Sequence, residues 1–308
     1  MSGALLLSTA ATSTAAADGV ADESIKCASA ASGDGPFYPG PSASDVYDKA
    51  FGKGPAVPGL DKSTPQGLAA WKNWDGAGHD LLLVTSYGKS GEHARIIGID
   101  PGTGKHVGTV AIAASHVGGI AVSKGWAFVQ GRNSGSEHTI RKYELSDLRV
   151  AMKKSGTPYL KQVGKARKVP AASFLAADGG TVYAGKFNAS GRGTMQSYAV
   201  GADGSLTKQK TYEVPKKAQG LMVTKDHFVF STSHGRDNRS NLYVVDKGAT
   251  DIDRPSTKCY RAPSMVEGIT QLDGQAYLLF ESGSYKYSDA LNVIKNLHEG
   301  KVSAVTNP

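Results

Sequence analysis

Gln66-Gly67-Leu68-Ala69 is the first of five similar segments that recur along the chain. The other four are Gly118-Gly119-Ile120-Ala121, Ser173-Phe174-Leu175-Ala176, Gln219-Gly220-Leu221-Met222 and Glu267-Gly268-Ile269-Thr270. Their first residues are numbers 66, 118, 173, 219 and 267, so successive segments lie 52, 55, 46 and 48 residues apart. A period near fifty residues indicates a repeat fold in which each unit is one supersecondary element.

Each unit contains four short runs rich in Val, Ile, Leu, Tyr and Phe, bounded by Gly and Asp turns, as strands are. In the first unit we predict strands at residues 67–71, 81–85, 95–100 and 108–112. The second strands of the later units fall at 126–130, 181–185, 227–232 and 276–281, and the third strands at 140–145, 195–200, 241–246 and 290–294. Four strands in each of five units predict an all-β fold, a single five-bladed β-propeller with an N-terminal arm.

The last strand of a unit ends on proline, which suits an outer edge where a missing ladder donor costs little. These ends are Lys168-Val169-Pro170, Glu213-Val214-Pro215, Arg261-Ala262-Pro263 and Thr306-Asn307-Pro308. We therefore expect residues 61–308 to form the propeller, with its fifth outer strand at the last of these ends. Residues 18–60, rich in Gly and Pro turns, form the predicted arm.

The first 17 residues read as an export signal. An uncharged stretch begins at Ala4, and Ala15-Ala16-Ala17 before Asp18 fits a small-residue cleavage site. This pattern predicts a secreted protein; a disordered tail on a cytosolic protein is the alternative. The two cysteines, Cys27 and Cys259, would form a disulfide in an exported chain that ties the arm to the ring, or else remain two unrelated thiols.

The formal net charge of +8 favours anionic partners such as wall polymers or nucleic acid, or serves solubility alone. The basic residues are scattered and no RNA-binding motif appears, so we predict no specific nucleic-acid binding. No segment outside the signal is long enough to span a bilayer. We predict that the protein is a monomer. Its predicted partner is a small polar ligand or glycan, with an anionic wall polymer as a further candidate.

A functional site is predicted from the long, polar, glycine-bearing link between the second and third strands of every unit. In a four-stranded blade these links share one face with the starts of the inner strands, around the central channel. The links have similar lengths but different side chains, which favours one composite site over five equivalent ones. The predicted ligand-binding residues are Gln66, Tyr87, Arg132, Gln219, His234, Arg236 and Glu281.

Two residues at this face could carry chemistry. His116 is a candidate base or ligand, or else a histidine held by a backbone carbonyl. Glu267 is a candidate general acid or metal ligand, or else a structural ion-pair partner of Lys217 or Arg132. No nucleophile elbow, zinc motif, phosphate-binding loop or dinucleotide fingerprint is present. Asp246, Asp251 and Asp253 lack the spacing of a calcium loop, so we predict no metal, and the sequence indicates no cofactor.

Three segments carry a resemblance to known proteins: His116-Val117-Gly118-Gly119-Ile120-Ala121, Ala218-Gln219-Gly220-Leu221 and Ser231-Thr232-Ser233-His234-Gly235. They resemble segments of secreted actinobacterial β-propeller proteins, and more distantly YVTN/NHL-type and gluconolactonase-like propellers. The resemblance implies the fold and export. Gluconolactonase-like enzymes hold a channel calcium with a Glu, an Asn and an Asp, and only Glu267 has a counterpart here.

Two functions therefore stay open. The first is a secreted protein that binds a carbohydrate or another polar or anionic wall component at one site over the channel. The second is an extracellular hydrolase or lyase for a lactone, ester or glycan, with Glu267 and His116 as its acid–base pair and Arg132 or Arg236 stabilising negative charge.

Overall fold

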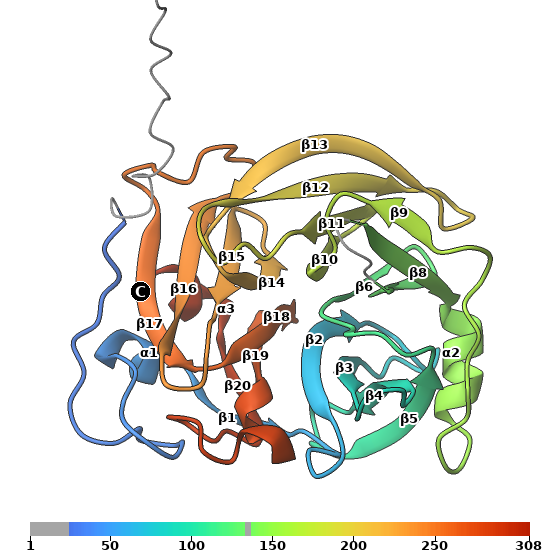
Figure 1. The fold of residues 1–308 in the computed structure, drawn as a ribbon, viewed down its shortest axis with the longest axis horizontal. Coiled ribbons are helices and arrows are strands. Elements are labelled where there is room, and N and C mark those ends of the chain that lie inside the picture. Colours follow the sequence, from blue (N-terminus) through green and yellow to red (C-terminus); the bar gives the residue numbers. More distant parts are fainter. Residues whose placement is uncertain (1–24, 133–136) are drawn as a thin grey trace, which may run out of the picture.

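The computed structural model describes residues 25–132 and 137–308, so the predicted export signal lies outside the described residues. Five four-stranded antiparallel sheets are arranged around a common axis, which confirms the predicted five-bladed β-propeller (Figure 1). In each blade the first strand of the repeat is innermost. The described residues contain no helix long and apolar enough to cross a membrane.

The first two blades follow the predicted strand order. Blade 1 consists of β2 (Thr64–Trp71), β3 (Leu81–Tyr87), β4 (Ala94–Ile99) and β5 (His106–Ile112). Blade 2 consists of β6 (Ile120–Ser123), β7 (Trp126–Gln130), β8 (His138–Glu144) and β9 (Arg167–Val169). An unpredicted helix, α2 (Leu145–Met152), stands between β8 and β9. It buries Leu148 and Met152 in the cluster that also holds Leu81 and Ile96.

Blades 3 and 4 also match the predicted pattern. Blade 3 consists of β10 (Phe174–Asp178), β11 (Thr181–Gly185), β12 (Gly193–Val200) and β13 (Leu206–Val214). Blade 4 consists of β14 (Ala218–Val223), β15 (His227–Thr232), β16 (Arg239–Asp246) and β17 (Lys258–Ser264).

Blade 5 is closed by a strand from the other end of the chain. It consists of β18 (Val266–Leu272), β19 (Gln275–Phe280), β20 (Asn296–Lys301) and β1 (Gly52–Ala56), in that order. The third strand predicted at residues 290–294 is therefore wrong, and so is the outer strand predicted at the C-terminus. A short helix, α3 (Val302–Thr306), follows β20 instead. Pairing β1 with β20 closes the ring and leaves this blade with four strands, like the others.

The glycines of the repeated segment mark where neighbouring inner strands approach most closely. A Cβ atom on Gly268 would lie 2.5 Å from the backbone nitrogen of Leu68 in the next blade. A Cβ atom on Gly220 would lie 2.6 Å from the carbonyl oxygen of Glu267. Real Cβ atoms do not approach backbone atoms this closely. Glycine therefore lets the inner strands pack backbone against backbone around a narrow channel.

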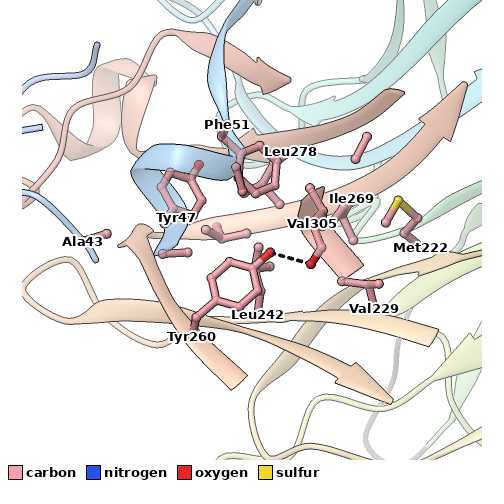
Figure 2. Packing of buried hydrophobic residues seen from close by; sticks show 14 of the residues in the cluster. Ala43, Tyr47, Phe51, Met222, Val229, Leu242, Tyr260, Ile269, Leu278 and Val305 are labelled. Carbon is pink, nitrogen blue, oxygen red and sulfur yellow. Dashed lines mark hydrogen bonds between the residues drawn. The ribbon is translucent and has the colours of Figure 1, made fainter. Parts of the chain in front are cut away.

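The arm is held against blades 4 and 5. Its helix α1 (Asp45–Ala50) is capped by Ser44, whose hydroxyl accepts a hydrogen bond from Tyr47 N at 3.1 Å. The Tyr47 hydroxyl is joined to His298 Nδ1 at 2.6 Å, and the Tyr47 ring stacks on Phe51. Burial lowers the pKa of His298 to about 3, so this histidine is neutral. Figure 2 shows the surrounding cluster, in which Tyr260 donates to the carbonyl of Val305.

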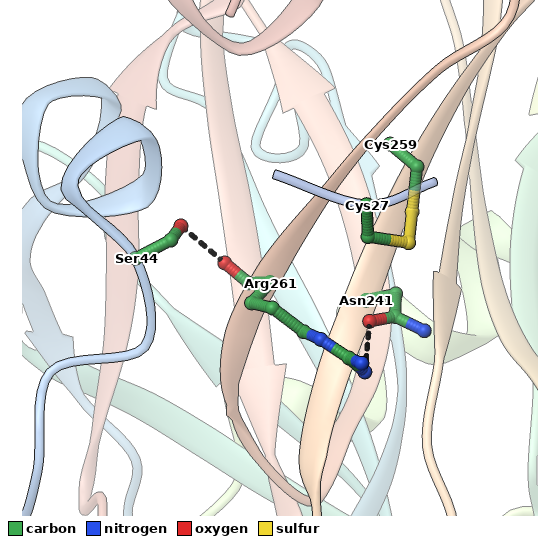
Figure 3. The surroundings of a disulfide bond; sticks show 5 residues. All are labelled: Cys27, Ser44, Asn241, Cys259 and Arg261. Atoms are coloured by element: carbon green, nitrogen blue, oxygen red, sulfur yellow. Dashed lines mark hydrogen bonds between the residues drawn. A yellow bond between two sulfur atoms is a disulfide. The ribbon is translucent and has the colours of Figure 1, made fainter. Parts of the chain in front are cut away.

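The disulfide between Cys27 and Cys259 confirms the predicted link between arm and ring (Figure 3). The bond joins residues 232 positions apart in sequence. The next arm residue pairs with the same strand: Ala28 N donates to the Cys259 carbonyl at 2.8 Å, and Arg261 N donates to the Ala28 carbonyl at 2.9 Å. Cys27 and Ala28 of the arm are thus fixed to the outer strand of blade 4.

Candidate functional site

The links and the starts of the inner strands are tied together by a recurring backbone device. Before three inner strands a residue other than glycine has a left-handed φ, a conformation that costs about 1 kcal/mol or more. Two of their carbonyls accept from the residue that follows the second strand of the same blade: Lys217 (φ 63°) from Ser233 N at 3.1 Å and Met265 (φ 59°) from Glu281 N at 3.1 Å. The carbonyl of Val117 (φ 51°), before the inner strand of blade 2, instead accepts from Thr85 Oγ1 in the second strand of blade 1 at 2.8 Å. The strained turns therefore hold the links over the channel.

A cavity of about 280 Å³ lies at this mouth of the channel, and four blades contribute to it. Its lining consists of Gln66, His116, Gln130, Ser173, Phe187 and Gln219. The structure thus brings together three of the predicted site residues, from blades 1, 2 and 4. The lining contains three carboxamides, a hydroxyl, an imidazole and a phenyl ring, and none of these residues is a lysine, arginine or carboxylate.

Two carboxyl groups meet beside this cavity. Glu267, at the start of β18, is 2% exposed and shares a side-chain hydrogen bond with Glu281, which begins the short 3-10 helix η1 (Glu281–Gly283). Burial, and then the charge of Glu281, raise the pKa of Glu267 well above its usual range. Burial also raises the pKa of Glu281, against the opposing effects of Gln66 and Lys286. Two carboxyls in such contact favour sharing one proton, which the pair keeps to a higher pH than a free carboxyl does.

The carboxyl pair determines how the lining amides are oriented. Gln66 Nε2 donates to Glu281 Oε2 at 2.8 Å, and Gln219 Nε2 donates to Glu267 Oε1 at 3.1 Å. Their amide oxygens therefore remain available as acceptors at the cavity. Gln130 is oriented the other way, because its Oε1 accepts from Gly118 N and its amide nitrogen stays a donor. The cavity wall thus offers both acceptors and a donor at fixed positions.

His116 lies between this cavity and a second one. The second cavity, of about 380 Å³, is lined by His116, Tyr87, Arg132 and residues of the first link. The centroids of the His116 and Tyr87 rings lie 4.9 Å apart, with the rings tilted by 32°. His116 keeps accessible surface, although the surrounding loops desolvate it. Desolvation, and then the charge of Lys286, lower the pKa of His116, so the ring is neutral at neutral pH. No described residue hydrogen-bonds either ring nitrogen.

The remaining predicted site residues do not reach the channel cavity. Glu267 does not line it, and no hydrogen bond joins His116 to Glu267 among the described residues. Arg236 donates to both carboxylate oxygens of Asp289, at 2.7 and 2.6 Å, and lies over the Tyr287 ring. His234 lines a different cavity in blade 4. The pairing of His116 with Glu267 as acid and base stays a prediction.

Two lining residues were not among the predicted site residues. Gln130 is the last residue of β7, and Phe187 lies two residues beyond the end of β11. Both lie where the second strand passes into the long link, the same place as Glu281 after β19. That equivalence within the repeat is the sequence signal that identifies them.

An acidic group lies elsewhere, at the outer part of blades 3 and 4. Carboxylate oxygens of Glu213, Asp251 and Asp253 lie within 4.8 Å of one another. Arg192 Nη2 donates to Asp253 at 2.5 Å, and Ile252 N donates to Glu213, so protein groups already engage these carboxylates. Asp246 belongs to a separate turn, where it accepts from Ser256.

The carboxyl pair makes the stability of the fold depend on pH. The pair binds a proton in the folded state that the unfolded chain releases near pH 4.5, so the free energy of unfolding should fall as the pH rises from there through neutral. Each unit of pKa difference corresponds to about 1.4 kcal/mol. Glu267→Gln keeps the neutral hydrogen-bonding form and should flatten this decline, which makes the variant the more stable protein at pH 9. Urea unfolding at pH 5 and pH 9 measures this change in the free energy of unfolding. The control is Glu137→Gln at an exposed position. If the free energy of unfolding of Glu267→Gln falls with pH as steeply as that of the wild type, the two carboxyls do not share a proton.

No protein-family model matches the chain, and no curated protein does. Among solved structures, the Kuenenia stuttgartiensis hydrazine synthase is similar to it, with 13% identity over 71% of this chain and 56% of that chain and a TM-score of 0.42. The Dos1 propeller has 12% identity over 65% of this chain and 52% of that chain, with a TM-score of 0.33. Kluyveromyces lactis Hsv2 has 11% identity over 65% of this chain and 56% of that chain, with a TM-score of 0.32. The chain spans about half the length of these proteins. The class of the protein rests on its own strand pairing: it is a five-bladed β-propeller with a cavity at its channel mouth.

Proposed function

We propose that this protein is a binding propeller that recognises a hydroxyl-rich ligand of the carbohydrate class at the channel-mouth cavity. The observation that carries the proposal is the cavity lining, which offers amide acceptors, an amide donor, a hydroxyl and a phenyl ring without a formal charge. Sugar hydroxyls both donate and accept, and the apolar face of a sugar ring packs on an aromatic side chain. The preset amide orientations also lower the cost of binding.

The neighbouring cavity favours a ligand longer than one ring. His116 belongs to the walls of both cavities, so a second ring would reach Tyr87 and Arg132. Arg132 would then meet an anionic substituent, which fits a cell-wall component. The disulfide supports the further proposal that the protein works outside the cytosol, because such bonds persist in oxidising compartments.

The alternative function is a hydrolase or lyase, and one observation favours it. A carboxyl group that keeps its proton at neutral pH can serve as a general acid, and Glu267 has a raised pKa. However, Glu267 is 2% exposed and hydrogen-bonded to Gln219, so a substrate in the cavity meets the amide before it meets the acid. Binding is therefore the function that the geometry supports better.

One screen separates the two functions. The chain from residue 18 onward is applied to a glycan array and to a panel of lactones and esters, with and without calcium. Saturable binding of a glycan without turnover supports the proposal. Hydrolysis of a panel member that disappears in Glu267→Gln would overturn it in favour of the enzyme.

Phe187→Ala should lower the affinity for the glycan found in that screen about tenfold, because the phenyl ring supplies the apolar surface on which a sugar ring packs. A tenfold loss of affinity corresponds to about 1.4 kcal/mol. The melting temperature should change little, since Phe187 is half-buried and lies in a link. Tyr285→Ala is the matched control, because this aromatic residue is 42% exposed on the corresponding link of blade 5 and does not line the cavity. Equal affinity of both variants, measured by calorimetry, would place the ligand elsewhere.

A further inference from the structure

Another cavity, in blade 4, differs in chemistry from the two cavities beside His116. It has a volume of about 200 Å³ and lies where β14 begins and β16 and β17 pair. Lys217, Arg239 and Arg261 line it together with His234. Its other lining residues are asparagines and residues with hydroxyl groups, and none is a carboxylate. Three basic side chains thus share one small space.

The two arginine side chains of this cavity hydrogen-bond to neutral partners. Arg239 Nη2 donates to the Ser42 carbonyl of the arm at 2.7 Å, and Arg261 Nη1 donates to Asn241 Oδ1 at 2.8 Å (Figure 3). No ion pair involves Lys217, Arg239 or Arg261 within residues 25–132 and 137–308. The contrast with Arg236 is direct, because Arg236 in the same link is paired with Asp289 and does not line the cavity.

The backbone positions these groups before any ligand arrives. Lys217 N donates to the Asn188 carbonyl at 2.9 Å, and the Lys217 carbonyl accepts from Ser233 N at 3.1 Å, which fixes its left-handed turn. Arg239 is tethered to the arm, and the arm is anchored by the disulfide and by Ser44, which donates to the Arg261 carbonyl at 2.8 Å (Figure 3). Like charges that line one small cavity repel one another, and a bound anion offsets that repulsion.

We propose that this cavity binds a tetrahedral oxyanion, phosphate or sulfate, either free or as a terminal group of a larger molecule. Guanidinium groups match the oxygens of such anions in pairs, and an ammonium group adds a point charge. Asparagine amides and hydroxyl groups in the lining supply further donors. The proposal is independent of glycan binding at the channel mouth, although the rings of His234 and Phe187 lie 6.2 Å apart and place the two cavities side by side.

The test uses inorganic phosphate and sulfate as probes at constant ionic strength, with chloride as reference. Calorimetry should show saturable binding of one anion per chain, and saturation should raise the melting temperature through linkage. Lys217→Asn and Arg239→Gln should each weaken binding of the anion at least tenfold. Asparagine is chosen at position 217 because it tolerates the left-handed backbone there. Arg236→Gln and Lys225→Asn remove the same charge outside the cavity and should leave the affinity unchanged.

A second arm separates the sources of the anion. Tighter binding of a sugar phosphate or sugar sulfate than of the inorganic ion assigns the site to a terminal group, and equal binding assigns it to the free ion. A response that does not saturate, or one that Arg239→Gln retains in full, overturns the proposal even if Lys217→Asn fails to fold. Glycan binding measured on the same variants reports separately on the channel cavity.

Discussion

Gly268→Ala is expected to destabilise the propeller by about 3 kcal/mol, the upper end of the usual cost of overpacking and one of the two largest effects predicted for this chain. The added Cβ would lie 2.5 Å from the nitrogen and 2.8 Å from the Cβ of Leu68, and 3.1 Å from the carbonyl carbon of Gly67. Backbone atoms cannot turn aside as a flexible side chain can, so the inner strands of blades 5 and 1 must separate. These two blades meet through the contact of β18 with β2.

Urea unfolding monitored by tryptophan fluorescence measures this effect. Gly191→Ala is the matched control, because a Cβ there meets no atom within 4 Å and its φ is not left-handed. The control should lie within about 0.5 kcal/mol of the wild type, as surface changes usually do. If Gly268→Ala unfolds at the same urea concentration as the control, the inner strands do not pack as closely as described.

Replacement of both cysteines, Cys27→Ala with Cys259→Ala, is expected to cost about 4 kcal/mol. Cross-links that close long loops remove much freedom from the unfolded chain, and removal of a native disulfide typically costs 2–5 kcal/mol. The bond also anchors the segment that begins at Ala28, whose backbone pairs with Cys259 and Arg261. The arm before Ser42 should therefore become sensitive to limited proteolysis in the variant.

The reduced wild-type protein provides the internal comparison. Reductant should lower the melting temperature of the wild type to that of the double variant and leave the variant itself unaffected. A wild-type melting temperature that does not respond to reductant after full reduction, verified by thiol titration, would show that the bond contributes little. The ring should still assemble in the variant, because β1 and the contacts of Tyr47 do not depend on the disulfide.

The strands of the first four blades were largely predictable because each repeat carries its own local signals. Hydrophobic runs between Gly and Asp turns placed β7, β11 and β15 at their observed bounds. Helix α2 was not predicted, because Leu145–Met152 is a short insertion within one repeat and has no equivalent in the others.

The candidate site was predictable only in part. Topology puts the inner-strand starts and the links on one face, so Gln66, Gln219 and His116 could be grouped from the sequence. The contact of Glu267 with Glu281 could not be read from the sequence, because β18 and β19 pair irregularly between Val266 and Ile269, where Glu267 lies, and Glu281 follows the end of β19. Which side chains face a cavity depends on rotamers and on neighbours from other blades, and the repeat pattern carries neither.

The sequence by itself determined the number of blades and most of their strands, because period and turn chemistry are local properties, and it offered the pairing of the two cysteines as one of two alternatives. Only the tertiary structure decided how the ring closes. The repeat pattern suggests that the last unit supplies its own outer strand, but β1 fills that place from the arm. Strand β20 leaves one backbone edge unpaired, and pairing it with β1 satisfies those hydrogen bonds and joins the two ends of the chain. Such a non-local choice becomes visible only when the strands are placed in space.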